Sequence, residues 1–349
     1  MVSDERLAAS TLGRGTAYGR AATAPFRKLR AFLYRHPFVL VPLRRLLLAV
    51  PLLFVVSSLS FVLVSLTPGD AAREILGINA TPEEYAQLRR SLGLNLPLYD
   101  QYWNWLRHAF EGNLGASFLS GEKVTQVIGS GLPVTLSLIL LAVVVVAVLG
   151  VGLGVFSAVR GGVAGRLVDA ASMLGFAIPA FWLGLILIVV FAVKLNWFPA
   201  IGYVPLTQSA TEWIRSLTLP VLALAIGGVA GVARQTREAM LDALNSEYIR
   251  MARANGLPPR SLYFRHALKN ASIPVVTQLG LLTIALLGGT VLVENVFALQ
   301  GLGRLVVGAT TQHDLPVVQG IAVVFTLIVV VVNLLVDLAY TLLNPRVRA

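Results

Sequence analysis

The sequence contains no cysteine and few charged residues. Without cysteine, neither a disulfide framework nor a thiolate metal site is possible. Charged residues make up 13% of the 349 residues, roughly half of the ~25% found in a typical soluble domain. Apolar residues make up 56%, and the mean hydropathy is +0.76. This composition excludes an ordinary water-facing surface and intrinsic disorder, and it predicts a membrane protein with several spans.

Signatures of catalysis are also missing. None of the four lysines follows a glycine, whereas a Walker A loop requires Gly-Lys. The four histidines are far apart and form no His-Glu-x-x-His pattern, and no Gly-x-Ser-x-Gly elbow occurs. The net charge is +11, and the basic residues lie between long apolar runs. Nucleic-acid binding requires basic residues on one solvated face, so this distribution argues against it. We therefore expect no catalytic centre, no metal site and no nucleic-acid partner.

Six apolar segments are long enough to be membrane helices, which need roughly 20 residues. They are residues 46–66, 133–158, 167–193, 217–233, 273–297 and 315–343. The second is uncharged over 136–155, and its side chains favour insertion by about 4–8 kcal/mol. The fourth is short and rich in glycine. The expected fold is all-α and integral to the membrane, with six spans and a transmembrane domain over 133–344.

Lysine and arginine are distributed unequally between the two sides. Twenty of them fall in residues 1–45, in the short connection after the second span, in 234–272 and in 345–349, against eight on the other side. Because basic residues accumulate on the cytoplasmic side, both termini are predicted to be cytoplasmic.

The basic tail, residues 1–45, is not a secretory signal, because Pro42, Arg44 and Arg45 interrupt its apolar stretch. Its segment 26–43 is either a basic flank that sets topology or a stretch along anionic headgroups.

The segment 67–132 is predicted to form a small helical cap on the outer membrane face. Thr81-Pro82-Glu83-Glu84 is a typical helix start, with an N-cap threonine, proline at the first position and acids in the first turn. That helix should end near residue 92. A second helix over 99–110 carries Tyr102, Trp103 and Trp105, which suit the membrane interface.

The cytoplasmic connection 234–272 is unusual for a loop. Residues 237–254 contain no glycine or proline and are predicted to continue the fourth span as a helix. Gly256 fits the left-handed position after a helix end. Pro258 and Pro259 then suit the start of a short helix over 259–266, and Pro274 is expected to start the fifth span. The apolar side chains of the short helix require a partner groove or packing on the chain's own bundle.

Residues 248–257, Tyr-Ile-Arg-Met-Ala-Arg-Ala-Asn-Gly-Leu, resemble the EAA loop of ABC importer permeases, in particular the dipeptide and oligopeptide branch. Ala252, Ala254, Gly256 and Pro274 match spaced positions of that family, and Arg253 stands where other branches have alanine. Further matching motifs are Pro68-Gly69-Asp70, Gly112-Asn113-Leu114-Gly115, Pro179-Ala180-Phe181, Trp197-Phe198-Pro199, Glu294-Asn295-Val296-Phe297 and Gly301-Leu302-Gly303.

The sequence departs from this family pattern at three places. Gln300 replaces the usual proline, Asn344 replaces the usual aspartate, and residues 1–40 lie outside the pattern.

The resemblance implies a type I importer permease that moves dipeptides or oligopeptides into the cytoplasm across a bacterial inner membrane. It also implies a second, similar permease, two cytoplasmic ATPases that hold ATP and Mg²⁺, and an extracytoplasmic substrate-binding protein. This chain itself would need no cofactor. The implied ATPase-coupling residues are Ala252, Arg253, Ala254, Gly256, Leu257, Arg260, Leu262, Tyr263, Phe264 and Arg265. Candidates for the pore or gate are Pro179, Phe181, Glu294 and Phe297.

Two alternatives remain for the function. One is a nickel or nickel-chelate permease of the same family. The other is an intramembrane enzyme or an independent secondary transporter, which would need polar groups at mid-depth, whereas the ionisable residues lie near the span ends.

Individual residues in the spans carry further predictions. Asp169 is expected to be structural, beside Arg166, and Asp337 to contact an arginine of the fourth connection. Glu294 either contacts substrate or caps the turn over 298–303. Pro179 is expected to kink the third span.

Two glycine groups predict close helix packing, either within the chain or against the second permease. They are Gly150, Gly152 and Gly154, and Gly227, Gly228 and Gly231.

Overall fold

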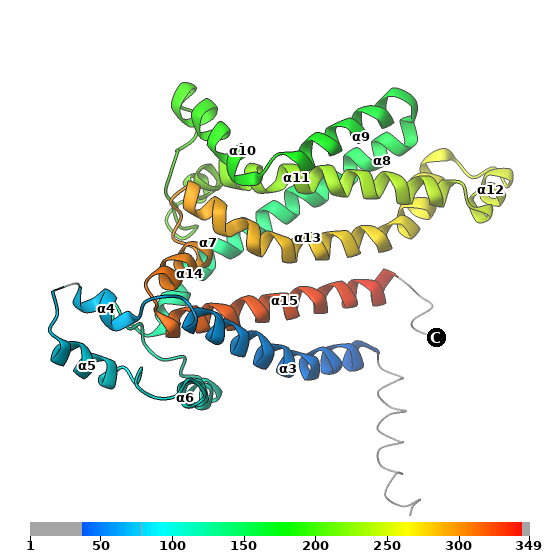
Figure 1. Cartoon of the computed structure of the whole chain (residues 1–349). Helices are drawn as coiled ribbons and strands as arrows, with labels where there is room; N and C mark the ends of the chain where they lie inside the picture. Colours follow the sequence, from blue (N-terminus) through cyan, green and yellow to red (C-terminus); the bar gives the residue numbers. More distant parts are fainter. Residues whose placement is uncertain (1–36, 78, 344–349) are drawn as a thin grey trace, which may run out of the picture.

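The computed structural model describes residues 37–77 and 79–343, and this part of the chain is helical apart from turns and one short bridge. Figure 1 shows long helices running between two ends of a bundle. In order along the chain, the helices are α3 (Pro37–Ser65), α4 (Ala71–Leu76), α5 (Pro82–Ser91), α6 (Leu98–Phe110), α7 (Val124–Val145), η1 (Val146–Gly150), α8 (Val151–Arg160), α9 (Gly162–Ala177), α10 (Ala180–Leu187), η2 (Ile188–Lys194), α11 (Ala210–Leu244), α12 (Glu247–Ala254), η3 (Ser261–Ala267), α13 (Leu268–Val296), α14 (Leu302–Thr311) and α15 (Leu315–Leu343), where η marks a π-helical segment.

The predictions for residues 1–36 and 345–349, including the basic tail and the positions of both termini, lie outside the described residues. The helices are longer than the predicted spans: α3 begins at Pro37, ahead of the predicted span start at residue 46, and the helix of the second span runs from Val124 to Arg160 around the predicted 133–158. The long apolar stretches mark only the middle of each helix, since helices continue into the polar flanks.

Within the described residues, five helices are long and apolar enough to cross a membrane, whereas six spans were expected. The expected third span is divided, because α9 ends at Ala177 and α10 starts at Ala180. Ile178 is extended, with φ −93° and ψ 117°. Proline disfavours a helical conformation at the preceding residue and has no N–H to donate. Pro179 therefore breaks this segment completely, and the prediction of a mere kink was wrong.

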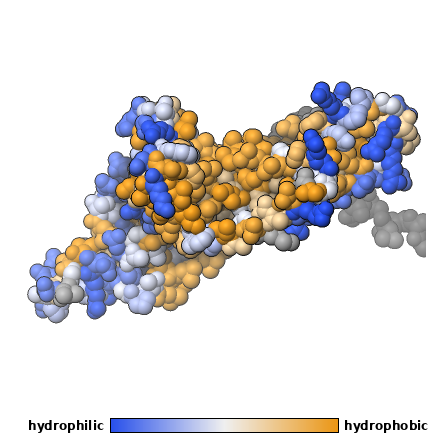
Figure 2. All heavy atoms as spheres, turned by 90° about the horizontal axis from the view of Figure 1, so that it is seen from above, coloured by the Kyte–Doolittle hydropathy of each residue, from blue (hydrophilic) through white to orange (hydrophobic). Residues whose placement is uncertain are grey.

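Polar residues gather at the two ends of the molecule. Figure 2 shows a broad hydrophobic band on one face, with hydrophilic residues at either end. In Figure 1, the cap formed by α4, α5 and α6 lies with α14 towards one end, and α12 lies at the opposite end. The short apolar helix over Ala180–Lys194 follows α9, and the two together bring the chain back to the end where α11 begins.

Helix α11 lies at the centre of the bundle. Of the 18 most apolar consecutive residues of α11, 72% are buried inside the bundle. The corresponding share in the other four long helices is 17–39%. Glycines on η1 and α8 allow a close approach to it: a Cβ at Gly154 would lie 2.5 Å from the Ala233 carbonyl oxygen, and one at Gly150 would lie 2.9 Å from the Val232 Cβ. A Cβ at Gly152 would meet nothing within 4 Å. The predicted close packing is therefore confirmed within the chain for Gly150 and Gly154, and it was wrong for Gly152.

Two ion pairs join helices that are distant in sequence. Arg45 on α3 donates to Asp337 on α15, at 2.5 Å from Nε and 2.9 Å from Nη2. Arg237 on α11 pairs with Asp169 on α9 at 3.2 Å. Both aspartates are structural, as expected, but Asp337 pairs with Arg45 of α3 rather than with an arginine of the fourth connection. The fold sets these pairs, because α3 packs along α15 and α9 packs along α11.

The two predicted helices of the cap are confirmed. Thr81 and Glu84 make a reciprocal capping box at the start of α5, and α6 spans Leu98–Phe110. Hydrogen bonds from the Thr81 backbone N–H and hydroxyl hold the pKa of Glu84 below its usual range. The Tyr102 hydroxyl lies within hydrogen-bond distance of Ser57 and Ser58, which fixes α6 against α3.

Two glycines of α8, Gly154 and Gly152, provide a matched test of the central packing. Gly154→Ala should destabilise the protein by about 1–3 kcal/mol, because the new methyl group overpacks the contact with α11. Gly152→Ala makes the same chemical change in open space and should leave stability unchanged or slightly raised. Thermal unfolding in detergent measures both, and equal midpoints would contradict the assigned packing.

Candidate functional site

The end of the bundle that holds α12 contains the residues predicted for coupling. The prediction of an uninterrupted helix over 237–254 was wrong, because α11 ends at Leu244 and α12 begins at Glu247. Ser246 is extended, with φ −70° and ψ 153°, and its hydroxyl donates to the Ala243 carbonyl at 2.5 Å. Serine competes in this way for helix-end carbonyls, which favours a break.

Gly256 ends α12 as predicted. Its φ is +77°, a region that glycine adopts without a Cβ penalty. The Gly256 N–H donates to the Arg253 carbonyl, and the Leu257 N–H donates to the Ala252 carbonyl at 3.2 Å. This pair of bonds is the Schellman motif. It turns the chain back towards the bundle with both backbone groups satisfied.

The segment after this turn differs from the prediction. No separate short helix covers 259–266 in the described chain, because η3 runs directly into α13 and the two form one apolar helix over Ser261–Val296. Pro274 lies inside α13 rather than at its start. Membrane helices tolerate an internal proline where neighbours and local widening satisfy the freed carbonyl. The coupling segment and the fifth span are therefore one continuous element.

The predicted coupling residues divide into an anchored set and an exposed set. Leu262 is buried, and Ala252 and Leu257 pack against the same apolar cluster. Tyr263 is half-buried. The exposed side chains are Arg253, Ala254, Gly256, Arg260, Phe264 and Arg265. Phe264 is 61% exposed, so much of its aromatic surface is not covered by the described part of the chain.

Sequence reasoning missed the residues that hold this segment in place. Ile249 and Met240 are fully buried in the cluster that supports α12 and η3. The Asn270 side chain donates to the Tyr248 hydroxyl at 2.5 Å, tying α13 to α12. Amphipathic spacing in α12 could have indicated Ile249, but only the fold brings Asn270 and Tyr248 together.

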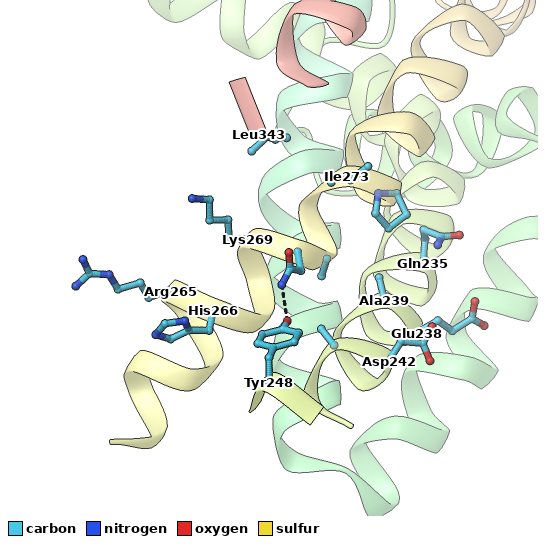
Figure 3. Close-up of a pocket in the computed structure, with 14 residues that line it drawn as sticks. Gln235, Glu238, Ala239, Asp242, Tyr248, Arg265, His266, Lys269, Ile273 and Leu343 are labelled. Carbon is cyan, nitrogen blue, oxygen red and sulfur yellow. Dashed lines mark hydrogen bonds between the residues drawn. The ribbon is translucent and has the colours of Figure 1, made fainter. Parts of the chain in front are cut away.

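A cavity of about 1060 Å³ opens between α11, α12, η3 and α13 (Figure 3). Its acidic side chains, Glu238 and Asp242, belong to α11. Its basic side chains lie on the opposite side, on η3 and α13: Arg265, His266 and Lys269. The cavity therefore offers charges of both signs beside the exposed segment.

The four candidate pore residues occupy different environments. Glu294 is fully buried and accepts hydrogen bonds from the Thr135 hydroxyl at 2.7 Å and the Arg304 N–H at 2.9 Å. These bonds are those expected of a cap on the turn before α14. Phe297 is also buried, and a Cβ at Gly184 on α10 would lie 2.9 Å from its ring. Phe181 and Pro179, at the start of α10, are exposed.

Comparison with known proteins matches nearly all of the described chain. Residues 150–349 match the family described as "Binding-protein-dependent transport system inner membrane component". Residues 38–139 match its N-terminal part, "Binding-prot-dependent transport system membrane comp, N-term".

Three relatives show how far the similarity extends. A Brucella abortus protein named as a peptide transport system permease is 42% identical over 307 residues. The Oligopeptide transport system permease protein AppB of Bacillus subtilis is 38% identical over 310 residues. The Glutathione transport system permease protein GsiC of Escherichia coli is 39% identical over 307 residues. Each comparison covers 88% of this chain and 98% of the relative. The chain belongs to the family of multi-pass inner membrane permease components of binding-protein-dependent ABC transport systems.

Proposed function

We propose that this chain moves short peptides into the cytoplasm as one of two permeases in an ABC importer. Relatives named for peptide, oligopeptide and glutathione transport support this substrate class. ATP belongs to the partner ATPase subunits of such systems. The proposed assembly contains a second, similar permease, two ATPases and an extracytoplasmic binding protein.

The exposed set beside Gly256 is the proposed contact with an ATPase subunit. Phe264 and Met251 are 61% and 68% exposed, and Arg253 and Arg265 lie near them in sequence. Aromatic, methionine and arginine side chains are enriched at protein interfaces. The observation that carries the proposal is that Phe264 and Arg265 lie on η3, which is continuous with α13, so a displacement there reaches the bundle through one helix.

The fold also supports the proposed orientation. Helix α12 lies at the opposite end from the cap formed by α4, α5 and α6. Basic residues are concentrated at the α12 end, which favours the cytoplasm for that end. Rocking between inward-open and outward-open states requires only that nucleotide binding favours one state by a few kcal/mol.

Phe264 tests the coupling surface. Phe264→Asp should lower ATP-driven uptake about tenfold or more, because a charged side chain cannot fill an apolar groove on a partner. The side chain is exposed, so membrane insertion and thermal stability should stay unchanged. Uptake and ATPase activity of the assembled transporter in proteoliposomes measure the effect. Phe264→Leu is the control and should retain most activity, and full uptake by Phe264→Asp would contradict the assignment.

The absence of cysteine makes the orientation directly testable. In intact cells, a membrane-impermeant thiol reagent should label Glu83→Cys on α5. It should label Arg260→Cys only after the membrane is opened, because residue 260 is expected on the cytoplasmic side. Both residues are exposed, so accessibility reports side rather than burial. Labelling of Arg260→Cys in sealed cells would refute the orientation.

A competition assay separates peptide from nickel transport. Uptake of a labelled dipeptide by the complete transporter should fall at least tenfold under excess unlabelled dipeptides and remain unchanged under the same concentration of Ni²⁺. The reason is that the two ligands share no chemistry that one site would recognise. Uptake of radioactive nickel that dipeptides do not inhibit would favour the nickel alternative.

A further inference from the structure

A second cavity, of about 490 Å³, lies between α3, α6 and α15. We call it the α6 groove. Its walls include Val50 and Phe54 of α3, Leu106 and Phe110 of α6, and Val323 of α15, and almost all of its lining is apolar. The groove lies on the cap side of the bundle, away from the coupling surface and the cavity of Figure 3.

The groove lies at the depth of the hydrocarbon core. At 1.5 Å per residue, its lining residue Ser57 is about 12 Å from the end of α3 at Ser65. Val323 is likewise about 12 Å from the start of α15 at Leu315. Both helices are long and apolar enough to cross a membrane, and a hydrocarbon core is about 30 Å thick, so both positions are well inside it. Water does not stably fill an apolar groove at that depth, so the occupant has to be apolar.

Helix α6 lies across α3 at the same level. The Tyr102 hydroxyl is 2.9 Å from the Ser57 hydroxyl and 3.0 Å from the Ser58 hydroxyl. The Tyr102 ring packs edge-on against Phe54 and Phe61, with ring centres 6.1 and 5.5 Å apart. Figure 1 views α6 along its axis while α3 runs across the picture, so the two helices cross. Because α3 is a membrane-crossing helix, α6 runs roughly along the membrane plane.

The described chain covers only part of the apolar side of α6. Tyr99, Trp103 and Phe110 lie on one side of the helix, because a helix turns once in about 3.6 residues. These three side chains are 72%, 50% and 80% exposed. Asn104 and His108 lie on the other side and are also exposed. Phe110 lines the groove, so the apolar side faces the hydrocarbon and the polar side faces away from it, as in an amphipathic helix of the membrane interface.

A cation stands at the border between the two sides of α6. The Arg107 side chain is exposed, and its Cζ lies 5.4 Å from the centre of the Trp103 ring. Tryptophan is enriched at the level of the lipid headgroups, and an arginine there donates charge-assisted hydrogen bonds to phosphate. A charged donor beside an apolar groove complements a phospholipid, which joins an anionic phosphate to acyl chains.

We propose that the α6 groove binds one acyl chain of a phospholipid from the leaflet on the cap side, with Arg107 beside the phosphate of that lipid. The bound chain fills the space between α6 and the two membrane-crossing helices and holds α6 against them. The proposal concerns the bilayer rather than the transported substrate, so its failure and the failure of the proposed function are distinguishable.

Photolabelling tests the proposal in the assembled transporter. The complex is placed in nanodiscs of phosphatidylethanolamine and phosphatidylglycerol, with a small share of phosphatidylethanolamine that carries a diazirine midway along one acyl chain. After illumination, mass spectrometry measures the labelling of each residue. Leu106 and Phe110 should be labelled about fivefold more than Leu140 and Val144 of α7, because a chain held in a groove stays longer than one at an open surface. Leu140 and Val144 are 61% and 57% exposed and provide matched controls.

Three variants sharpen this test. Ala109 lines the groove, so Ala109→Trp should fill it and reduce the labelling of Leu106 to the level measured on α7. Arg107→Gln should reduce that labelling about threefold, because the phosphate loses a charge-assisted hydrogen bond. Arg90→Gln removes the same charge from an exposed residue of α5 and should leave the labelling unchanged.

Two outcomes would overturn the proposal. One is labelling in the groove that is no stronger than on α7, or that Arg107→Gln and a folded Ala109→Trp variant leave unchanged. The other is a photoreactive phenylalanine analogue in place of Phe110 that crosslinks to the second permease instead of to lipid. Thermal unfolding shows whether each variant is folded, and Arg107→Gln changes an exposed side chain, so it tests the groove even where Ala109→Trp does not fold.

Discussion

Close packing of glycine against α11 is the contact on which the rest of the bundle depends. Gly150 at the end of η1 and Gly154 on α8 bring these two segments against α11 at distances that no other residue permits without displacement. In hydrocarbon, helices gain little from hiding apolar side chains from each other, so close van der Waals contact between backbones has to supply the association. The central position of α11 then determines where α9, α10 and α13 lie, because each of them packs against it.

The same helix connects the membrane part to the proposed coupling surface. Its last turns carry Glu238 and Asp242 on one wall of the cavity in Figure 3. After the break at Asn245 and Ser246, α12 and η3 return the chain to α13 through the turn at Gly256. Helices α11 and α13, which contact each other along the bundle, are therefore joined again through the exposed segment. A force applied there acts on both, which suits a contact that transmits the state of an ATPase.

Glu294 shows how a buried polar group is accommodated in the bundle. It accepts hydrogen bonds from the Thr135 hydroxyl and the Arg304 N–H, and these bonds hold the turn that precedes α14. Burying a polar group without partners opposes folding, so the two bonds offset a cost that the fold would otherwise carry.

The sequence by itself determined the class of the protein, the cap helices and the turn at Gly256. These features depend on local rules: apolar length, the N-cap residue Thr81 with acids in the first turn, and the tolerance of glycine for a left-handed backbone. The tertiary structure decided the rest. Pro179 broke a helix whereas Pro274 did not, because the outcome depends on which neighbours satisfy the freed carbonyl. Arg45 paired with Asp337, and Arg237 with Asp169, because helices distant in the sequence pack side by side. Hydropathy and charge patterns contain no information about those neighbours.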